Sequence, residues 1–318
     1  MTAMQPRNPM TLRLLVGLAT FHPLLSSAGT LAGEADAFTA PDGLNFFTGM
    51  SVAQAEFIGS LGMDFDNSAA EVDAYSFELS AFLSKPIGLF AGYSMLPYFQ
   101  YEANFLRPEG IPAGIPLDDE DLHEIDLSLF IYKMESGSPW ITGAWINPSL
   151  STDFESVSGD DFFFDLAVAA GYRVSDTLIL GAGIGALNLT GDTAVYPGIG
   201  FSWSPTEDLY FTLYGPNFRA GWELTDSWRL GFEVRPNGGI WNIDTAGGTR
   251  NIEFSSFRVG LGSSHRLTEK LWLSFGGGVT VGNSLNITNT HGSDLYKNTL
   301  DDLDEGYYGF VSLSLKAW

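Results

Sequence analysis

The last thirteen residues of the chain, 306–318, read G-Y-Y-G-F-V-S-L-S-L-K-A-W. Apolar and polar side chains alternate here: one phase holds Val311, Leu313 and Leu315, and the other holds Ser312, Ser314 and Lys316. Because successive side chains of a strand point to opposite faces, this pattern predicts a strand with one apolar and one polar face. Trp318 ends the chain out of phase with the apolar residues, and a bulge near Ala317 would restore it to the apolar face.

The same alternation recurs along the chain between short turns. It predicts fourteen antiparallel strands, at residues 45–58, 71–84, 89–106, 122–134, 140–153, 161–174, 178–189, 195–204, 209–214, 218–224, 228–243, 252–267, 271–285 and 306–318. The phase changes within 252–267, which indicates a bulge near Ser255. Three central segments are short for membrane strands, and if two of them are not membrane strands the number falls to twelve.

The composition fits strands that cross a membrane. Charged residues make up 17% of the 318 residues and aromatic residues 14%, while the mean hydropathy is close to zero. Outside the amino terminus there is no apolar run of about 18 residues, so a helical membrane protein is excluded. In transmembrane barrels the lipid-facing and lumen-facing residues alternate, so the hydropathy averages out. We therefore predict an all-β fold, a transmembrane antiparallel up-and-down β-barrel over residues 45–318.

The amino terminus is typical of an export signal. Residues 1–28 combine Arg7 and Arg13 with an apolar run and the small residues Ser26, Ser27 and Ala28. Cleavage after Ala28 or Ala32 would leave residues 29–44 as a flexible periplasmic lead-in. The chain has no Cys, so neither a lipid anchor on Cys nor a disulfide is expected.

The formal net charge of −23 makes nucleic acid an unexpected partner, since phosphate binding requires clustered Lys and Arg. The acids concentrate in predicted loops at residues 64–73, 118–121, 153–161 and 294–305. Clustered carboxylates attract divalent cations, so these loops could bridge weakly to lipopolysaccharide, but none has the pattern of a calcium loop. A solvated surface is the simpler interpretation, and no metal site or cofactor is predicted.

The inward phase of the predicted strands carries charges of both signs. Early strands hold the acidic set Glu78, Glu102, Glu124, Asp126 and Asp165, and late strands hold the basic set Arg219, Arg229, Arg235 and Arg258. In a ring of fourteen strands the third strand faces the tenth, so these sets would line opposite walls of the lumen. The alternative is a lumen filled by local ion pairs, which Glu223, Glu233 and Glu253 favour.

Aromatic residues gather near one set of turns. They are Trp140, Tyr172, Trp203, Trp228 and Trp318, with Trp272 in the inward phase. Rings at this level are typical of the interfacial girdle of a membrane barrel, whereas a soluble core would place them at strand centres.

The closing strand resembles that of bacterial outer-membrane β-barrels, which implies a Gram-negative outer membrane and recognition of residues 306–318 by the barrel-assembly machinery. The chain also resembles an uncharacterised outer-membrane barrel family, a domain of unknown function. That resemblance rests on P-G-I-G at 197–200, Y-G-P-N-F at 214–218 and L-T-D-S-W at 224–228. It implies fold and location, and no activity.

Three functions remain open from the sequence. The first is a porin-like passive channel for small hydrophilic solutes, the second is a closed structural or surface-interaction barrel, and the third is a transporter of hydrophobic compounds. The third needs an apolar path, which the polar inward residues disfavour. An enzyme is not expected, because His123, His265 and His291 lie in no nucleophile motif.

Overall fold

The structure is a computed structural model and describes residues 51–135, 137–155, 157–188, 193–245, 248–289, 293–296, 300 and 302–315. The predicted signal, the lead-in and the chain end at Lys316, Ala317 and Trp318 lie outside these residues. Fourteen long strands are described: β1 (Ala53–Asp64), β2 (Glu71–Phe82), β4 (Ser94–Glu109), β5 (Glu120–Met134), β6 (Trp140–Thr152), β7 (Phe162–Ser175), β8 (Leu178–Asn188), β9 (Thr193–Trp203), β10 (Leu209–Tyr214), β11 (Asn217–Thr225), β12 (Trp228–Thr245), β13 (Gly248–Arg266), β14 (Leu271–Thr288) and β16 (Gly306–Leu315). β3 (Ile87–Gly88) and β15 (Asp302–Leu303) are two residues long. The prediction of fourteen antiparallel strands is confirmed.

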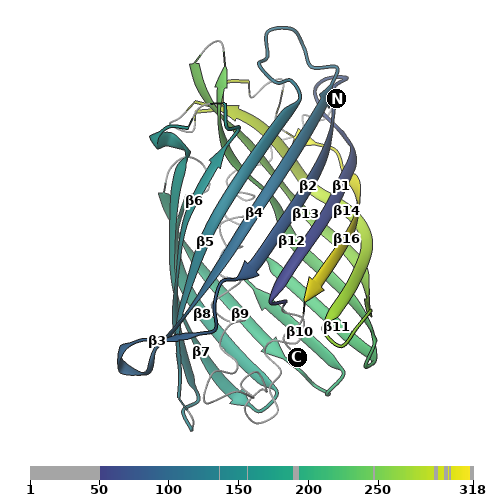
Figure 1. Cartoon of the computed structure of the whole chain (residues 1–318). Coiled ribbons are helices and arrows are strands. Elements are labelled where there is room, and N and C mark those ends of the chain that lie inside the picture. The colour runs from purple at the N-terminus through teal and green to yellow at the C-terminus, as the bar shows by residue number, and fades with distance from the viewer. Residues whose placement is uncertain are drawn as a thin grey trace, which may run out of the picture.

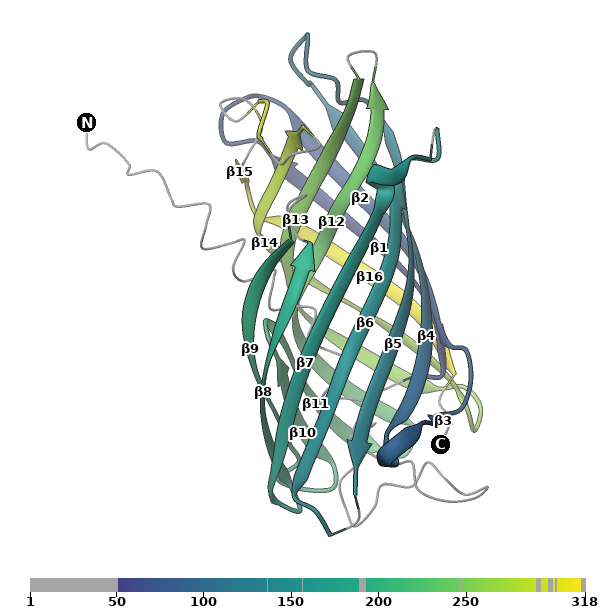
Figure 2. The same ribbon diagram turned by 90° about the vertical axis from the view of Figure 1, so that its left-hand side faces the viewer.

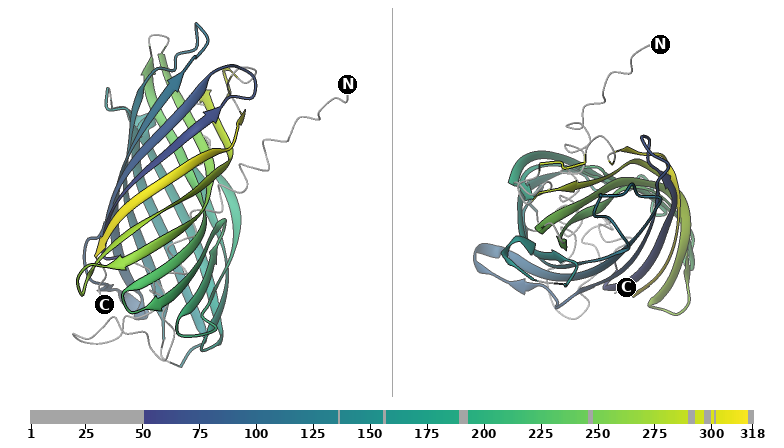
Figure 3. Two further views of the ribbon diagram at one scale, coloured as in Figure 1. Left: turned by 90° about the vertical axis from the view of Figure 1, so that its right-hand side faces the viewer. Right: turned by 90° about the horizontal axis from the view of Figure 1, so that it is seen from above.

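The strands form a closed ring (Figures 1 and 3). Each long strand pairs antiparallel with the next, and β16 completes the ring between β14 and β1. The closing strand therefore lies where its alternation predicts, with Val311, Leu313 and Leu315 each 46–47% exposed and Ser312 and Ser314 buried. The predicted bulge is also present, as a register shift between Ser255 and Phe257.

The two ends of the barrel differ. At the end where β1 begins and β16 stops, most connections are short, and we call this the turn end. The exception is the connection 83–93 between β2 and β4, which holds β3 and the 3-10 helix Phe90–Gly92, so the strand predicted from residue 89 begins at Ser94. The opposite end, called the loop end, carries the connections 65–70, 110–119, 153–161 and 289–305. Not every connection at the loop end is long, because β10 and β11 meet in a tight turn at Gly215 and Pro216. Of the helices in the described residues, none is long and apolar enough to cross a membrane.

The wall of the barrel is uneven in height. β12 and β13 have 18 and 19 residues, whereas β10 has six and β11 nine. Figure 2 shows β8 and β9 ending well below the loop-end tips of β12 and β13. Above these shorter strands β12 bends across the ring and forms a parallel pair with β6, at Asn242 and Thr152.

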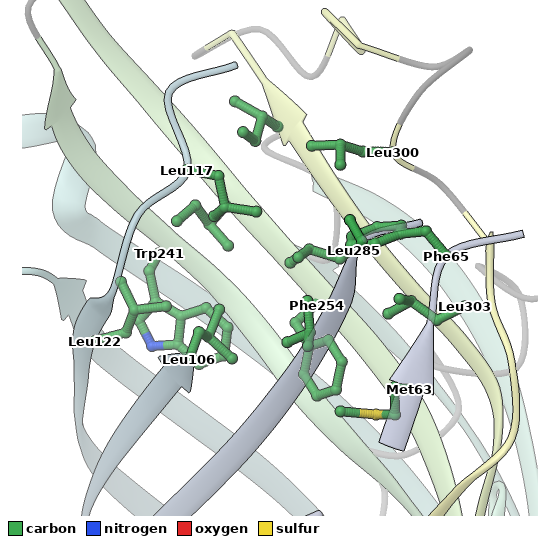
Figure 4. Close-up of a cluster of buried hydrophobic side chains, with 14 of the residues drawn as sticks. Met63, Phe65, Leu106, Leu117, Leu122, Trp241, Phe254, Leu285, Leu300 and Leu303 are labelled. Atoms are coloured by element: carbon green, nitrogen blue, oxygen red, sulfur yellow. The ribbon is translucent and has the colours of Figure 1, made fainter. Parts of the chain in front are cut away.

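The loop end is filled by apolar side chains, which we call the outer cluster (Figure 4). It consists of Met63, Phe65, Ala70, Val72, Leu106, Leu117, Leu122, Trp241, Ile243, Ile252, Phe254, Leu285, Ile287, Leu300 and Leu303. Leu117 and Leu300 come from loops, and their side chains are 2% and 1% exposed. The long loops therefore fold inward, and they join the walls formed by β1–β5 and β12–β14 into one apolar core.

Candidate functional site

Four glutamates form a continuous row across neighbouring strands of the lumen wall. Glu56 on β1 lies opposite Glu78 on β2, Glu78 opposite Glu102 on β4, and Glu102 opposite Glu124 on β5. Directly opposed residues on one face of an antiparallel pair have Cβ atoms about 4.5–5.5 Å apart. We call these four residues the glutamate row; in it, like charges lie side by side.

Two further acids extend this side of the lumen. The charge of Glu124 interacts with those of Asp126 and Asp165, so the acids of β5 and β7 belong to the same field. Asp126 is held by a chain of hydrogen bonds. Asn147 Nδ2 donates to Asp126 Oδ1 at 2.8 Å, and Ser128 Oγ donates to Asn147 Oδ1 at 2.7 Å. These bonds fix the orientation of the Asp126 carboxylate. They do not involve the glutamate row.

One arginine crosses the lumen. Arg235 on β12 donates from its guanidinium to Glu56 Oε1 at 2.5 Å, although β13, β14 and β16 separate their strands in the ring. The Nε of Arg235 also lies 3.5 Å from Glu233 Oε1. The Glu56 side chain is 6% exposed and that of Arg235 16%. This bridge joins Arg235 of the predicted basic wall to Glu56, an acid outside the predicted acidic set.

Arg258 lies beside Arg235 in the pairing of β12 with β13. It is 5% exposed, and its guanidinium carbon lies 5.9 Å from the centroid of the Tyr308 ring. Of the acids whose charges act on Arg258, Glu102 comes first, followed by Glu56. Arg258 therefore lies on the side of the lumen that faces the glutamate row.

The other two arginines of the predicted basic wall form local pairs. Arg229 lies 2.8 Å from Glu223 and stacks on Trp272 at 4.3 Å, while Arg219 lies 4.0 Å from Glu233. These local ion pairs along β11 and β12 are of the kind that the alternative of a filled lumen includes. The basic face toward the acids thus consists of Arg235 and Arg258.

The acids outnumber the cations that face them. In the described residues Glu78, Glu102 and Glu124 have no Lys or Arg nitrogen within 4.0 Å. No group of three or more His, Cys, Asp or Glu in that part of the chain is arranged to hold a metal ion. The row is therefore an electrostatic surface, spread over four strands, that attracts cations without a cage to fix one.

The predicted girdle residues within the described chain lie on the outer face near the turn end. Trp140, Tyr172, Trp203 and Trp228 are 41–56% exposed. Trp140 contacts Tyr172 edge to face, with ring centroids 5.0 Å apart. Trp272 is 3% exposed and points inward, in agreement with its phase.

His123 and His265 are the histidines of the described residues. His123 Nδ1 lies 2.9 Å from the Tyr101 hydroxyl, and its ring stacks on Phe154. His265 stacks between Trp228 and Phe275, and its Nε2 lies 3.0 Å from Ser263 Oγ. Ser263 in turn accepts a hydrogen bond from Trp228 Nε1 at 2.9 Å. This Ser–His contact therefore belongs to the aromatic girdle.

Sequence analysis missed Glu56, the acid that pairs with Arg235. The alternation from Gln54 to Ser60 places Glu56 on the inward face. The strand was predicted to start at residue 45, and over that longer range the alternation is not regular. The inward folding of Leu117 and Leu300 had no sequence signal, because proline-rich and acidic loops normally remain on the surface.

Residues 116–316 match the model of a protein family described as a domain of unknown function (DUF6268). The chain belongs to this family. No curated protein matches it. Among solved structures it is similar to an outer-membrane channel from Pseudomonas putida F1, with 11% identity, coverage of 89% of this chain and 99% of the other, and a TM-score of 0.43. It is also similar to the NanC porin (8%, 82% and 99%, TM-score 0.34) and to the Pseudomonas putida toluene transporter TodX (12%, 87% and 90%, TM-score 0.32).

Proposed function

We propose that this protein is a passive outer-membrane channel for small hydrophilic solutes and that it prefers cations. The glutamate row is the observation that carries the proposal, because a lumen wall with unbalanced carboxylates concentrates cations and repels anions. Rings and rows of acidic side chains select cations in this way without binding them tightly enough to stop conduction. The proposed role is transport without chemical conversion of the solute.

The location we propose follows from the outer surface of the barrel. Its exposed apolar side chains alternate with lumen-facing polar ones, and an aromatic band marks the turn end. Export through a signal at residues 1–28 and insertion by recognition of the closing strand would place the turn end in the periplasm. Lipid and lipopolysaccharide would then contact the outer surface, and the acidic loops could attract divalent cations weakly.

The solute path would pass between the glutamate row and the Arg235–Arg258 pair. Charges of opposite sign on facing walls create a field across the lumen, and this field orients water and polar solutes. The Arg235–Glu56 bridge narrows the path at this level. Neutralising the arginines would remove the cationic side of the constriction and leave the carboxylates in place.

A closed barrel is the second candidate, and the outer cluster favours it. Its apolar residues occupy the loop end, and a dry apolar constriction excludes ions. A closed lumen would give the charged residues a structural role, in which they satisfy one another inside the barrel.

Single-channel recording of the refolded mature protein in a planar bilayer separates these candidates. We expect steady conductance with a reversal potential that indicates cation preference. The double variant Arg235→Gln/Arg258→Gln should increase this preference, and the matched variant Glu78→Gln/Glu102→Gln should reduce it. A folded, silent barrel would support the closed alternative, and unchanged selectivity in both variants would show that these residues do not line the ion path.

A further inference from the structure

Arg258 is a buried cation that no acid contacts. It is 5% exposed, and within the described residues none of its nitrogens lies within 4.0 Å of a carboxylate oxygen. Its Nε has no hydrogen-bond partner there either. Arg235, directly opposite on β12, contacts both Glu56 and Glu233. Because a buried guanidinium needs acceptors, Arg258 offers donors to a group that the surrounding walls do not supply.

The Tyr308 hydroxyl lies beside this guanidinium. Tyr308 on β16 is opposite Gly278 on β14, and Gly278 is opposite Gly260 on β13. The Tyr308 ring extends across these two glycines, because a Cβ atom at Gly260 would collide with the hydroxyl. Gly260 shares the inward face of β13 with Arg258. The hydroxyl is buried without a hydrogen-bond partner among the described residues.

These two groups together suit a carboxylate. The Arg258 guanidinium carbon lies 5.9 Å from the centroid of the Tyr308 ring, so the phenol and the guanidinium border the same part of the lumen. A guanidinium presents several N–H donors in a planar fork that matches the two oxygens of a carboxylate, and a phenol can donate one more hydrogen bond.

Carboxylates without bound cations face these donors. Of the acids whose charges act on Arg258, Glu102 comes first, and of the charges that act on Glu102, that of Arg258 comes first. The two side chains nevertheless form no ion pair within 4.0 Å. Donors on one wall and acceptors on the other are therefore close enough to interact and too far apart to touch.

The lumen contains space at this level. Arg219 and Glu233 face the lumen beside Arg235, and their side chains are 39% and 22% exposed. Glu78 and Glu102 are also partly exposed, although they point inward. A side chain on the inward face is exposed to space inside the barrel. The charged groups therefore border a space that a small solute can share.

A solute with one charge would match only one wall. A simple cation would pair with the glutamate row and leave Arg258 and Tyr308 without an acceptor. A simple anion would pair with Arg258 and lie against unpaired carboxylates, which repel it. A zwitterion matches both walls, because its carboxylate accepts hydrogen bonds and its ammonium group donates three.

We propose that Arg258, Tyr308 and Glu102 form a lumen site for small amino-acid zwitterions. The carboxylate of the solute binds Arg258 and the Tyr308 hydroxyl, and its ammonium group binds Glu102 and the neighbouring Glu78. This names a solute class for the channel, and as a transport route it rests on the proposed function. The binding step does not depend on ion conduction.

Saturation-transfer NMR of the refolded mature protein in detergent micelles tests the site, because this method detects weak binding directly. The probes are glycine, β-alanine and γ-aminobutyrate, in which the two charges lie progressively further apart. Acetate and ethylammonium carry one charge each and serve as comparisons. We expect saturable binding of the amino acids, with the best probe reporting the distance between the walls, and weaker binding of both single-charge ions.

Two variants test the carboxylate end of the site. Arg258→Met should raise the Kd of the best amino acid about ten- to a hundredfold, the usual effect of losing a hydrogen bond to a charged group. Tyr308→Phe removes only the hydroxyl and should raise this Kd about two- to tenfold. It also replaces Arg258→Met as the test if that variant is not folded, since the hydroxyl has no partner to lose among the described residues.

Arg229→Gln is the matched control. Arg229 is another lumen arginine, but it pairs with Glu223 and stacks on Trp272. This variant should keep the wild-type Kd. Heat-modifiable migration in electrophoresis verifies that each variant is folded.

Four results would overturn the proposal: no amino-acid binding by the wild type, unchanged binding in the folded variants at Arg258 and Tyr308, an equal loss in Arg229→Gln, or acetate binding as tight as that of the amino acids. Single-channel recording of the same proteins separates this site from the proposed channel. Amino-acid binding by a silent barrel would remove the channel and keep the site. Conductance without amino-acid binding would keep the channel and remove the site.

Discussion

Replacement of Arg235 by Gln tests the bridge that crosses the lumen. The Arg235 guanidinium contacts Glu56 at 2.5 Å and Glu233 at 3.5 Å, and its charge also interacts with Glu78. With Gln at this position, Glu56 would keep the bond from Gln54 Nε2 at 3.2 Å but no cation. With Arg235 in place the Glu56 side chain is 6% exposed, so the substitution takes the cation from a largely buried carboxylate.

The expected loss of unfolding free energy is about 3–5 kcal/mol, the usual cost of removing one partner of a buried ion pair. Glu56→Gln in the same background should recover part of this loss, because the double variant no longer buries an unpaired charge. The interaction energy from the double-mutant cycle should fall within roughly 0.5–3 kcal/mol. Arg235→Lys should be intermediate, since one ammonium group cannot reproduce the contacts that two guanidinium nitrogens make with two carboxylates.

Reversible urea unfolding in phospholipid vesicles, followed by tryptophan fluorescence, measures these free energies. The slope of the unfolding free energy with denaturant should be the same in the wild type and in all variants, so that midpoint shifts report stability. A loss below about 0.5 kcal/mol for Arg235→Gln, or additive effects of the two substitutions, would refute the reasoning. The barrel would then hold Glu56 and Arg235 independently of one another.

Three further predictions test other parts of the structure. Val311→Lys, on the lipid face of the closing strand, should cost about 2–4 kcal/mol in vesicles if it lies at the membrane midplane, and a cost near zero would place this face in water. Gly238→Ala should cost clearly more than Gly114→Ala in the same unfolding assay. Both positions have positive φ, which alone costs about 1–3 kcal/mol, but of the two only Gly238 would bring the new Cβ against a backbone oxygen, that of Phe254. Equal costs would show that the wall relaxes at Gly238. Leu117→Asn should cost roughly 2–5 kcal/mol, as large-to-small core substitutions do, and raise single-channel conductance by admitting water to the outer cluster; an unchanged conductance would show that this cluster does not limit the path.

Some features of the fold follow from local pattern, and others do not. The closing strand, the bulge near Ser255 and the outward girdle residues were predictable because alternation and turn spacing assign each side chain to a face. The inward phase of Glu78, Glu102 and Glu124 was predictable for the same reason. Their direct opposition was not, because it depends on the register between strands, which the connections set.

The sequence by itself determined that this protein is a membrane barrel with a polar lumen, because the period of two places apolar residues on one face of every strand. Only the tertiary structure decided that Arg235 reaches Glu56 across the lumen, that the loop residues Leu117 and Leu300 close one end, and that β6 meets β12 above shorter strands. These contacts join segments far apart in the chain. Their formation depends on the closure and tilt of the ring, and no local pattern encodes the distance between strands that are not neighbours.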